Sequence, residues 1–260
     1  MIAIAMPVHR FVTTLMLLAV PWPAMADLRV DATRVVYEEG APTATSVRIH
    51  NVGKQPSLIQ AWLDTGDSSQ PLEQLRTPLL VTPPMFRLDE RGKRDIQIRA
   101  ADTSGLAKDR ESLLWLNILD IPARQTGSEQ QTLEFAMRWR LKVFHRPAGL
   151  AGAADEAPAA LTWFLQTDSQ GHSVLQATNP TPYFVSLAQL TLGEQHVGLD
   201  ASTAQIPPLG RWSQALPAGY GGREADSRLE VVWIDGKGVE HTVHARVSRS
   251  NAHPAMQLRP

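Results

Sequence analysis

The chain has 260 residues, of which 25 are lysine or arginine and 26 are aspartate or glutamate, and it contains no cysteine. The formal net charge of −1 gives no electrostatic reason to expect nucleic acid as a partner. The lack of cysteine excludes a disulfide framework and any site built on a thiolate, so burial of an apolar core must hold the fold together.

The first residues have the layout of a secretory signal peptide. Weakly basic His9 and Arg10 precede an apolar run over residues 11–20, and the segment closes on the small-x-small pattern Ala24-Met25-Ala26. This layout predicts a signal peptide over residues 1–26 and a mature chain that begins at Asp27. The apolar run is shorter than the about twenty residues needed to cross a bilayer, and no later stretch approaches that length. We therefore expect an exported protein without stable membrane insertion.

The next part of the chain consists of short runs of β-branched and aliphatic residues separated by turn-forming residues. Turn chemistry occurs at Glu39-Gly40, Asn51-Val52-Gly53, Arg91-Gly92 and Thr126-Gly127. Strands at this spacing predict an antiparallel β-sandwich rather than alternating helices and strands. The predicted strands cover residues 28–37, 45–51, 57–64, 79–82, 94–99, 112–120 and 133–145.

The last of these runs has an unusually regular pattern. Apolar side chains alternate with mostly polar ones, which indicates a strand because successive side chains of an extended chain point to opposite faces. Two interpretations stay open: the apolar row lies in this protein's own core, or part of it is lent to a partner. The row comprises Leu133, Phe135, Met137, Trp139, Leu141 and Val143.

A low-complexity segment rich in alanine and glycine, residues 148–158, is predicted to link a first domain, residues 27–147, to a second, residues 159–248. The pair Asp235-Gly236 between two alternating runs predicts a β-hairpin. Residues 249–260 are predicted to form a flexible tail. Strands of the second domain are predicted over residues 161–167, 173–179, 184–192, 229–234 and 239–247.

Motifs of enzymes are missing from the sequence. There is no Gly-x-Ser-x-Gly elbow, no phosphate-binding loop and no His-Glu-x-x-His motif. His241 and His244 are three residues apart, which on a strand places them on opposite faces and is unsuitable for a shared metal. We expect neither metal nor cofactor. A secreted hydrolase is supported only by eight histidines and scattered acidic residues.

A series of short motifs, in one order along the chain, resembles the periplasmic chaperones of the chaperone/usher pathway, the PapD-like family. The resemblance spans about residues 28–247 and implies an all-β protein with two immunoglobulin-like β-sandwich domains in an L-shaped arrangement and no enzymatic activity. The motifs are Thr33-Arg34-Val35-Val36-Tyr37, Asn51, Thr82-Pro83-Pro84-Met85-Phe86-Arg87-Leu88, Asp109-Arg110-Glu111-Ser112, Trp115-Leu116-Asn117, Ile121-Pro122, Arg140-Leu141-Lys142-Val143-Phe144-His145-Arg146-Pro147 and Asn179-Pro180-Thr181-Pro182-Tyr183.

The resemblance also implies partners and a site. The partners are pilus or fimbrial subunits, which receive the last strand of the first domain in an apolar groove, and an outer-membrane usher in the same periplasmic pathway. Leu133, Phe135 and Met137 correspond to the side chains that plug the groove. Arg34 and Lys142 correspond to the cations that hold the C-terminal carboxylate of the subunit and so fix the register of the paired strands. Self-association through the unoccupied strand is a further possibility.

A charge network between the domains is implied as well. Glu111 and Arg146 match two of its members, and Asp235 is the nearest candidate for the third, one position from where the family pattern places it. His145 and Trp139 depart from the residues usual at their positions. A second interpretation, an immunoglobulin-like binding or structural module of the envelope without chaperone activity, keeps the same fold but makes the apolar row ordinary core.

Overall fold

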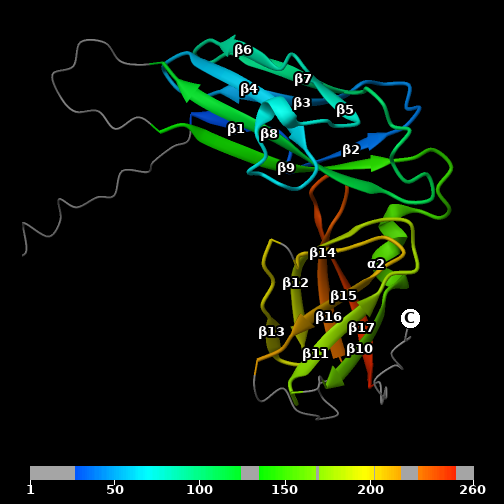
Figure 1. Ribbon diagram of the computed structural model, residues 1–260. Helices are drawn as coiled ribbons and strands as arrows, with labels where there is room; N and C mark the ends of the chain where they lie inside the picture. The colour runs from blue at the N-terminus through cyan, green and yellow to red at the C-terminus, as the bar shows by residue number, and fades with distance from the viewer. Residues whose placement is uncertain (1–26, 124–134, 168–169, 202, 218–227, 250–260) are drawn as a thin grey trace, which may run out of the picture.

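The structure is a computed structural model that describes residues 27–123, 135–167, 170–201, 203–217 and 228–249. Figure 1 shows two β domains set at a steep angle to each other, so that the molecule has the shape of an L. The predicted signal peptide, the plug residue Leu133 and residues 250–260 of the predicted tail lie outside the described residues.

The first domain consists of two β-sheets packed face to face. The four-stranded sheet has the order β1-β3-β7-β5, and the five-stranded sheet has the order β2-β9-β8-β4-β6. All neighbouring pairs are antiparallel except β2 and β9, which are parallel. The strands are β1 (Leu28–Val30), β2 (Arg34–Glu38), β3 (Thr45–Asn51), β4 (Ser57–Asp64), β5 (Leu79–Thr82), β6 (Met85–Leu88), β7 (Lys93–Ala100), β8 (Ser112–Pro122) and β9 (Met137–Arg146), with a 3₁₀ helix η2 (Leu72–Gln74).

The core of the first domain follows the period of two predicted from the sequence. On β4, Ile59 and Ala61 are buried, and on β8 Leu116 and Ile118 are buried between more accessible or polar neighbours. Ile49 of β3 belongs to the same cluster from the opposite sheet. Each strand therefore contributes one apolar face, and the two faces meet in a single core.

The second domain is an eight-stranded sheet folded over one core. Its order is β13-β12-β16-β17-β10-β11-β15, with β14 paired to β12. Trp163 of β10 and Trp212 of β15, which lie on either side of Ala177 of β11, meet edge to face with ring centroids 5.8 Å apart. The strands are β10 (Thr162–Thr167), β11 (Ser173–Thr178), β12 (Val185–Leu192), β13 (Gln195–Val197), β14 (Gln205–Ile206), β15 (Arg211–Ala215), β16 (Arg228–Ile234) and β17 (Glu240–Arg249).

The connection between the domains is folded rather than extended. The segment predicted as a linker, residues 148–158, contains a 3₁₀ helix η3 (Ala154–Glu156) and leads into the short helix α2 (Ala157–Ala160). Ala157 is fully buried in the core of the second domain, and the hydroxyl of Tyr183 donates to the carbonyl of Gly152 at 2.9 Å. Small side chains here allow the connection to pack closely against the second domain.

The all-β fold with two immunoglobulin-like sandwiches is confirmed, and the strands over 45–51, 57–64 and 79–82 have the predicted bounds. The prediction of one strand over residues 28–37 is wrong, because the chain crosses there from the four-stranded sheet to the five-stranded sheet. Within the described part of the chain, the last strand of the first domain begins at Met137, so that Phe135 and Ala136 precede it, and the predicted start at residue 133 lies outside the described residues. Strands β6, β13, β14 and β15 were not predicted.

Candidate functional site

Strand β9 has an edge that is only partly covered. It pairs with β8 from Met137 to His145, whereas β2 covers its other side only from Lys142 to Arg146. Within the described chain, residues 137–141 therefore have a neighbouring strand on one side and none on the other. An uncovered strand edge presents unpaired N–H and C=O groups that can pair with a strand of another chain.

The apolar row on β9 divides at this open edge. Leu141 and Val143 are 4% and 0% exposed and belong to the core of the first domain. Met137 and Phe135, farther toward the beginning of the strand, are 49% and 66% exposed. The row is thus divided: its end, Leu141 and Val143, is core, whereas Phe135 and Met137 are exposed apolar side chains.

Arg34 and Lys142 are brought together by the parallel pairing of β2 and β9, in which they lie directly opposite each other. The guanidinium Nη1 of Arg34 donates to the carbonyl of Ile234 at 3.0 Å, and the ammonium Nζ of Lys142 donates to Oε1 of Gln205 at 2.8 Å. Both acceptors belong to the second domain. The two cations are therefore fixed at the junction of the domains, beside the last residue of the open edge.

The surroundings at the junction also lower the pKa values of both cations. Burial, together with the nearby positive charge of Arg34, lowers the pKa of Lys142 to about 8. Burial lowers the pKa of Arg34 as well, while the charge of Asp235 acts in the opposite direction. Two neighbouring cations that are partly removed from water, with one ammonium close to losing its proton, form a site suited to a bound anion.

A second group of side chains on the same sheet was not recognised as part of the site from the sequence. Arg140 on β9 lies over the ring of Trp115, with its Cζ 4.3 Å from the ring centroid, and its Nη2 lies 2.7 Å from Oδ1 of Asp64. Asn117 donates to the other carboxylate oxygen at 2.7 Å. Burial alone would raise the pKa of Asp64, but these hydrogen bonds outweigh it and hold the pKa below its ordinary value.

The expected interdomain network is present with a different third member. Nε of Arg146 lies 2.8 Å from Oε1 of Glu111, whose side chain is 3% exposed, and Nη1 of Arg146 lies 3.1 Å from Oε1 of Glu38. The other oxygen of Glu111 accepts from the backbone N–H of Phe184 at 2.8 Å, which joins the two domains. Burial raises the pKa of Glu111 despite these partners.

Asp235 does not pair with Glu111 or Arg146 within the described residues, which corrects its expected place in the network. Its Oδ1 accepts from the backbone N–H groups of Lys237 and Val239, both at 2.8 Å, and its Oδ2 lies 2.9 Å from Nε2 of His241. These hydrogen bonds lower the pKa of Asp235 to about 2. The carboxylate is committed to its own hairpin turn, although it lines the same interdomain crevice as Glu111 and Arg146.

That hairpin turn lies against the first domain. The β16–β17 hairpin, coloured orange to red in Figure 1, reaches the underside of the five-stranded sheet. Gly238 has a φ of 87°, and a Cβ atom on it would lie 2.5 Å from Oγ1 of Thr33. Glycine is required here both for the backbone conformation and for the close approach of the two domains.

The two residues that depart from the family pattern both turn toward the core. His145 is fully buried and stacks on Tyr37, with ring centroids 5.8 Å apart. Burial lowers its pKa. Trp139 packs against the core cluster of the first domain. Neither side chain forms part of the exposed segment at the beginning of β9.

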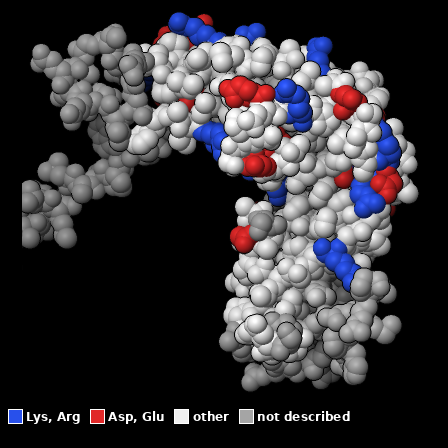
Figure 2. All heavy atoms as spheres, viewed as in Figure 1, with Lys and Arg blue, Asp and Glu red and all other residues white. Residues whose placement is uncertain are grey.

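The described surface offers little support for other kinds of site. Figure 2 shows acidic and basic side chains mixed over the first domain, without a broad region of one sign on that face. No cluster of three or more potential metal ligands occurs among the described residues. Within that same part of the chain, no helix is long and apolar enough to cross a membrane.

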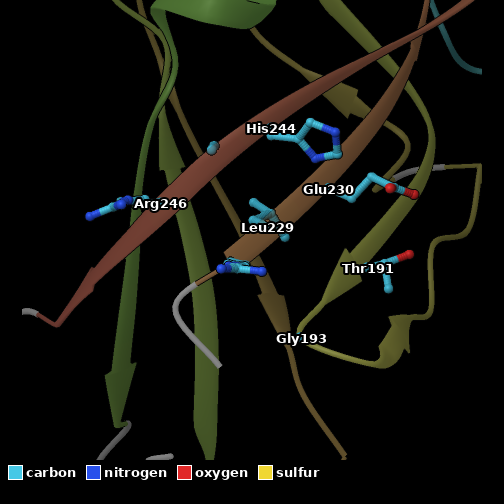
Figure 3. A pocket seen from close by; sticks show the side chains of 8 residues that line it. Thr191, Gly193, Leu229, Glu230, His244 and Arg246 are labelled. Carbon is cyan, nitrogen blue, oxygen red and sulfur yellow. The ribbon is translucent and has the colours of Figure 1, made fainter. Parts of the chain in front are cut away.

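A hollow of about 550 Å³ lies on the second domain and is open to solvent. Figure 3 shows Thr191, Glu230 and His244, from the neighbouring strands β12, β16 and β17, along this hollow. Its lining includes none of the residues predicted for the site.

Comparison with known proteins matches both domains. Residues 27–151 match the family model of the pili and flagellar-assembly chaperone, PapD N-terminal domain, and residues 156–245 match that of the pili assembly chaperone PapD, C-terminal domain. The chain is 39% identical over 168 residues to the probable fimbrial chaperone YadV of Escherichia coli (strain K12), with 64% of this chain and 68% of the relative covered. It is 38% identical over 190 residues to the chaperone protein FimB/FhaD of Bordetella pertussis, with coverages of 72% and 76%.

Solved structures agree with these sequence relatives. The crystal structure of the YadV chaperone is similar with a TM-score of 0.67 and 32% identity, covering 85% of this chain and 100% of the other. The structure of the Salmonella enterica SafA pilin in complex with the SafB chaperone contains a chain that is similar with a TM-score of 0.69 and 26% identity, covering 86% and 98%. The chain therefore belongs to the PapD-like family of pilus-assembly chaperones.

Proposed function

We propose that this protein binds pilus or fimbrial subunits by adding β9 to an incomplete subunit sheet, and that it caps and delivers them without catalysing a reaction. The observation that carries this proposal is the open edge at residues 137–141, which continues from the exposed apolar side chain of Phe135. A subunit strand along this edge would satisfy the unpaired backbone groups, and alternate side chains would fill its groove.

The plugs of this proposal are Leu133, Phe135 and Met137. Phe135 and Met137 have the exposure that the role requires. Met137 lies on the same face of β9 as Leu141 and Val143, because alternate residues of a strand share a face, and Phe135 is two residues before it. In a complex, the exposed apolar side chains of the chaperone would be buried in the core of the subunit, so that one apolar row would run from the chaperone core into the subunit core.

Arg34 and Lys142 would hold the C-terminal carboxylate of the subunit. Their place directly beside the open edge supports this role, since a carboxylate fixed there sets the register of every residue along the edge. A one-residue slip would turn all plugs to the wrong face. Hydrogen bonds from two ionised donors are roughly twice as strong as neutral ones.

The remaining parts of the proposal concern place and partners. We propose that the chain acts in the periplasm after removal of residues 1–26 and passes its subunits to an outer-membrane usher. Membership in a family of pilus-assembly chaperones supports both statements. When no subunit is bound, the same edge is available to a second copy of the chain, and we expect concentration-dependent self-association.

Co-purification of subunits tests this function. The wild-type chaperone and Lys142→Ala are each recovered from native periplasm, and the retained proteins are identified by mass spectrometry. Lys93→Ala, which removes an exposed lysine from β7 on the other sheet, is the matched control. We expect wild type and Lys93→Ala to retain subunits and Lys142→Ala to lose them. Equal retention by all three variants would contradict the anchor.

A further inference from the structure

The two anchor cations face a single row of residues across the second domain. Ser186 on β12 lies opposite Gln205 on β14 and also opposite Ile234 on β16. Gln205 accepts from Lys142, and the carbonyl of Ile234 accepts from Arg34. Neighbouring residues of the second domain thus supply one hydrogen-bond acceptor to each of the two cations of the first domain.

Only the oxygen of the Gln205 side-chain amide is hydrogen-bonded among the described residues. Its Oε1 accepts from Nζ of Lys142 at 2.8 Å and from Oγ of Ser186 at 3.1 Å. Its Nε2 is buried and has no hydrogen-bond partner among the described residues, and the same holds for Nε of Arg34. Buried donors are rarely left unpaired in native proteins, so two of them at one junction call for an acceptor.

A carboxylate is the acceptor that fits these groups. It has two oxygens with about four lone-pair sites and no hydrogen to donate, and it would meet only donors: an ammonium, a guanidinium and an amide N–H. The amide oxygen of Gln205 would repel a carboxylate, but that oxygen is turned to Lys142 and Ser186. The Nε2 group of the amide therefore keeps its hydrogen-bond donors available for an acceptor.

We propose that Gln205 is a specificity-determining residue of the carboxylate anchor, whose amide oxygen positions the Lys142 ammonium and whose amide N–H donates to the bound α-carboxylate. This inference rests on the proposed function and extends it to the second domain. The role differs from that of a packing contact between domains, because a packing contact has no reason to distinguish a terminal carboxylate from a terminal amide.

The test compares two forms of one ligand. A short soluble peptide with apolar residues at alternate positions is synthesised with a free C-terminal carboxylate and with a C-terminal amide, and the affinity of each for the full mature chaperone is measured by calorimetry. We expect the wild type to prefer the carboxylate. Gln205→Met keeps the length of the side chain but removes its donor and acceptor, and should reduce that preference about ten-fold.

Introducing a negative charge at the same position gives a sharper result. Gln205→Glu places a carboxylate beside Lys142, so it should abolish the preference for the carboxylate peptide while binding of the amide peptide changes little. Gln189→Glu is the matched control, because Gln189 is exposed on β12 of the same domain and bonds to Thr191. It should retain the wild-type preference.

The outcomes separate this inference from the proposed function. If the wild type shows no preference, or Lys142→Met keeps it, the carboxylate anchor itself is wrong. If the wild type prefers the carboxylate and Lys142→Met does not, but Gln205→Met and Gln205→Glu both keep the full preference, the role of Gln205 is overturned.

A second measurement does not depend on the peptide. The pKa of the Lys142 ammonium, followed by NMR of its side chain in the free chaperone, should fall in Gln205→Met and rise in Gln205→Glu relative to the wild type. These opposite shifts are expected because the first variant removes an acceptor from the ammonium and the second supplies a negative charge. Shifts of the same sign in both variants would contradict the direct contact.

Discussion

Arg34 and Lys142 lie directly opposite each other on the parallel strands β2 and β9, and each is hydrogen-bonded to a different strand of the second domain. Two like charges are thus kept as neighbours at a junction that is partly closed to water. This arrangement opposes the charged form of Lys142 in the free protein, and an arriving carboxylate would favour that form again.

Subunit affinity should therefore depend on pH above about 8. The pKa of Lys142 is lowered to about 8 in the free chaperone by burial and by Arg34, so the ammonium loses its proton above that pH. Because the bound carboxylate prefers the ammonium, the affinity should fall about ten-fold for each further pH unit. Lys142→Arg keeps a charge through this range and should give a flat profile, measured by calorimetry. A flat wild-type profile would contradict the assigned contact.

The free protein should show the linked effect on stability. The unfolded chain holds the Lys142 proton up to its ordinary pKa of 10.5, whereas the folded chain releases it near 8. Between these values the unfolded state binds more protons, so the contribution of Lys142 makes the free energy of unfolding rise with pH. Denaturant titrations of wild type and Lys142→Met across this window isolate the contribution, which should be absent in the variant.

Exposure along β9 predicts a clear division between binding and stability. Phe135→Ser alters a side chain that is 66% exposed, so the free energy of unfolding should change by no more than about 0.5 kcal/mol while subunit binding weakens. Leu141→Ala removes buried atoms from the same row and should cost about 2–5 kcal/mol. Urea denaturation of both variants measures the difference. If Phe135→Ser is as destabilising as Leu141→Ala, the exposed segment is ordinary core.

The interdomain network predicts unequal roles for the two partners of Arg146. Glu111 is 3% exposed and also accepts from the backbone of Phe184, so Glu111→Gln should cost about 1.5–3 kcal/mol and loosen the angle between the domains. Glu38 is 58% exposed, and Glu38→Gln should cost about 0–1 kcal/mol. Denaturation and small-angle scattering measure the two effects. Equal costs for both substitutions would refute the assigned roles.

The hairpin turn at Gly238 offers a separate test of the junction. Gly238→Ala and Gly171→Ala both place a side chain at nearly the same positive φ, 87° and 86°. Only the first would bring a Cβ within 2.5 Å of Thr33, because nothing lies within 4 Å of the added Cβ at Gly171. Gly238→Ala should therefore destabilise the protein more and increase proteolysis between the domains. Identical behaviour of the two variants would show that the close approach is unimportant.

Much of the fold could be predicted from the sequence because period-two patterns and turn residues are local signals. Strand β6 (Met85–Leu88) was not predicted: it has four residues and follows directly on Pro83-Pro84, a pair typical of turns. The crossing between β1 and β2 was missed because the apolar pattern continues through Ala32 while the chain changes sheets. A local pattern does not contain information on which sheet a strand joins.

The site was less predictable from local pattern alone. The apolar row from Leu133 to Val143 does not reveal where core ends and exposed edge begins, because that depends on how far β2 extends along β9. The meeting of Arg34 and Lys142 followed from the family resemblance. Gln205 and Glu38 carried no sequence signal, since a lone polar residue becomes significant only when the tertiary fold places it beside a charge.

The most direct test of the central claim is hydrogen exchange of the backbone amides of residues 137–141, measured in the free chaperone and in its complex with a co-purified subunit. In the free protein, the amides that face the open edge should exchange rapidly while those paired with β8 are protected. In the complex, strand addition predicts slow exchange throughout the segment. Unchanged exchange there, with new protection confined to other surfaces, would show that the subunit binds elsewhere and that β9 is not lent to it.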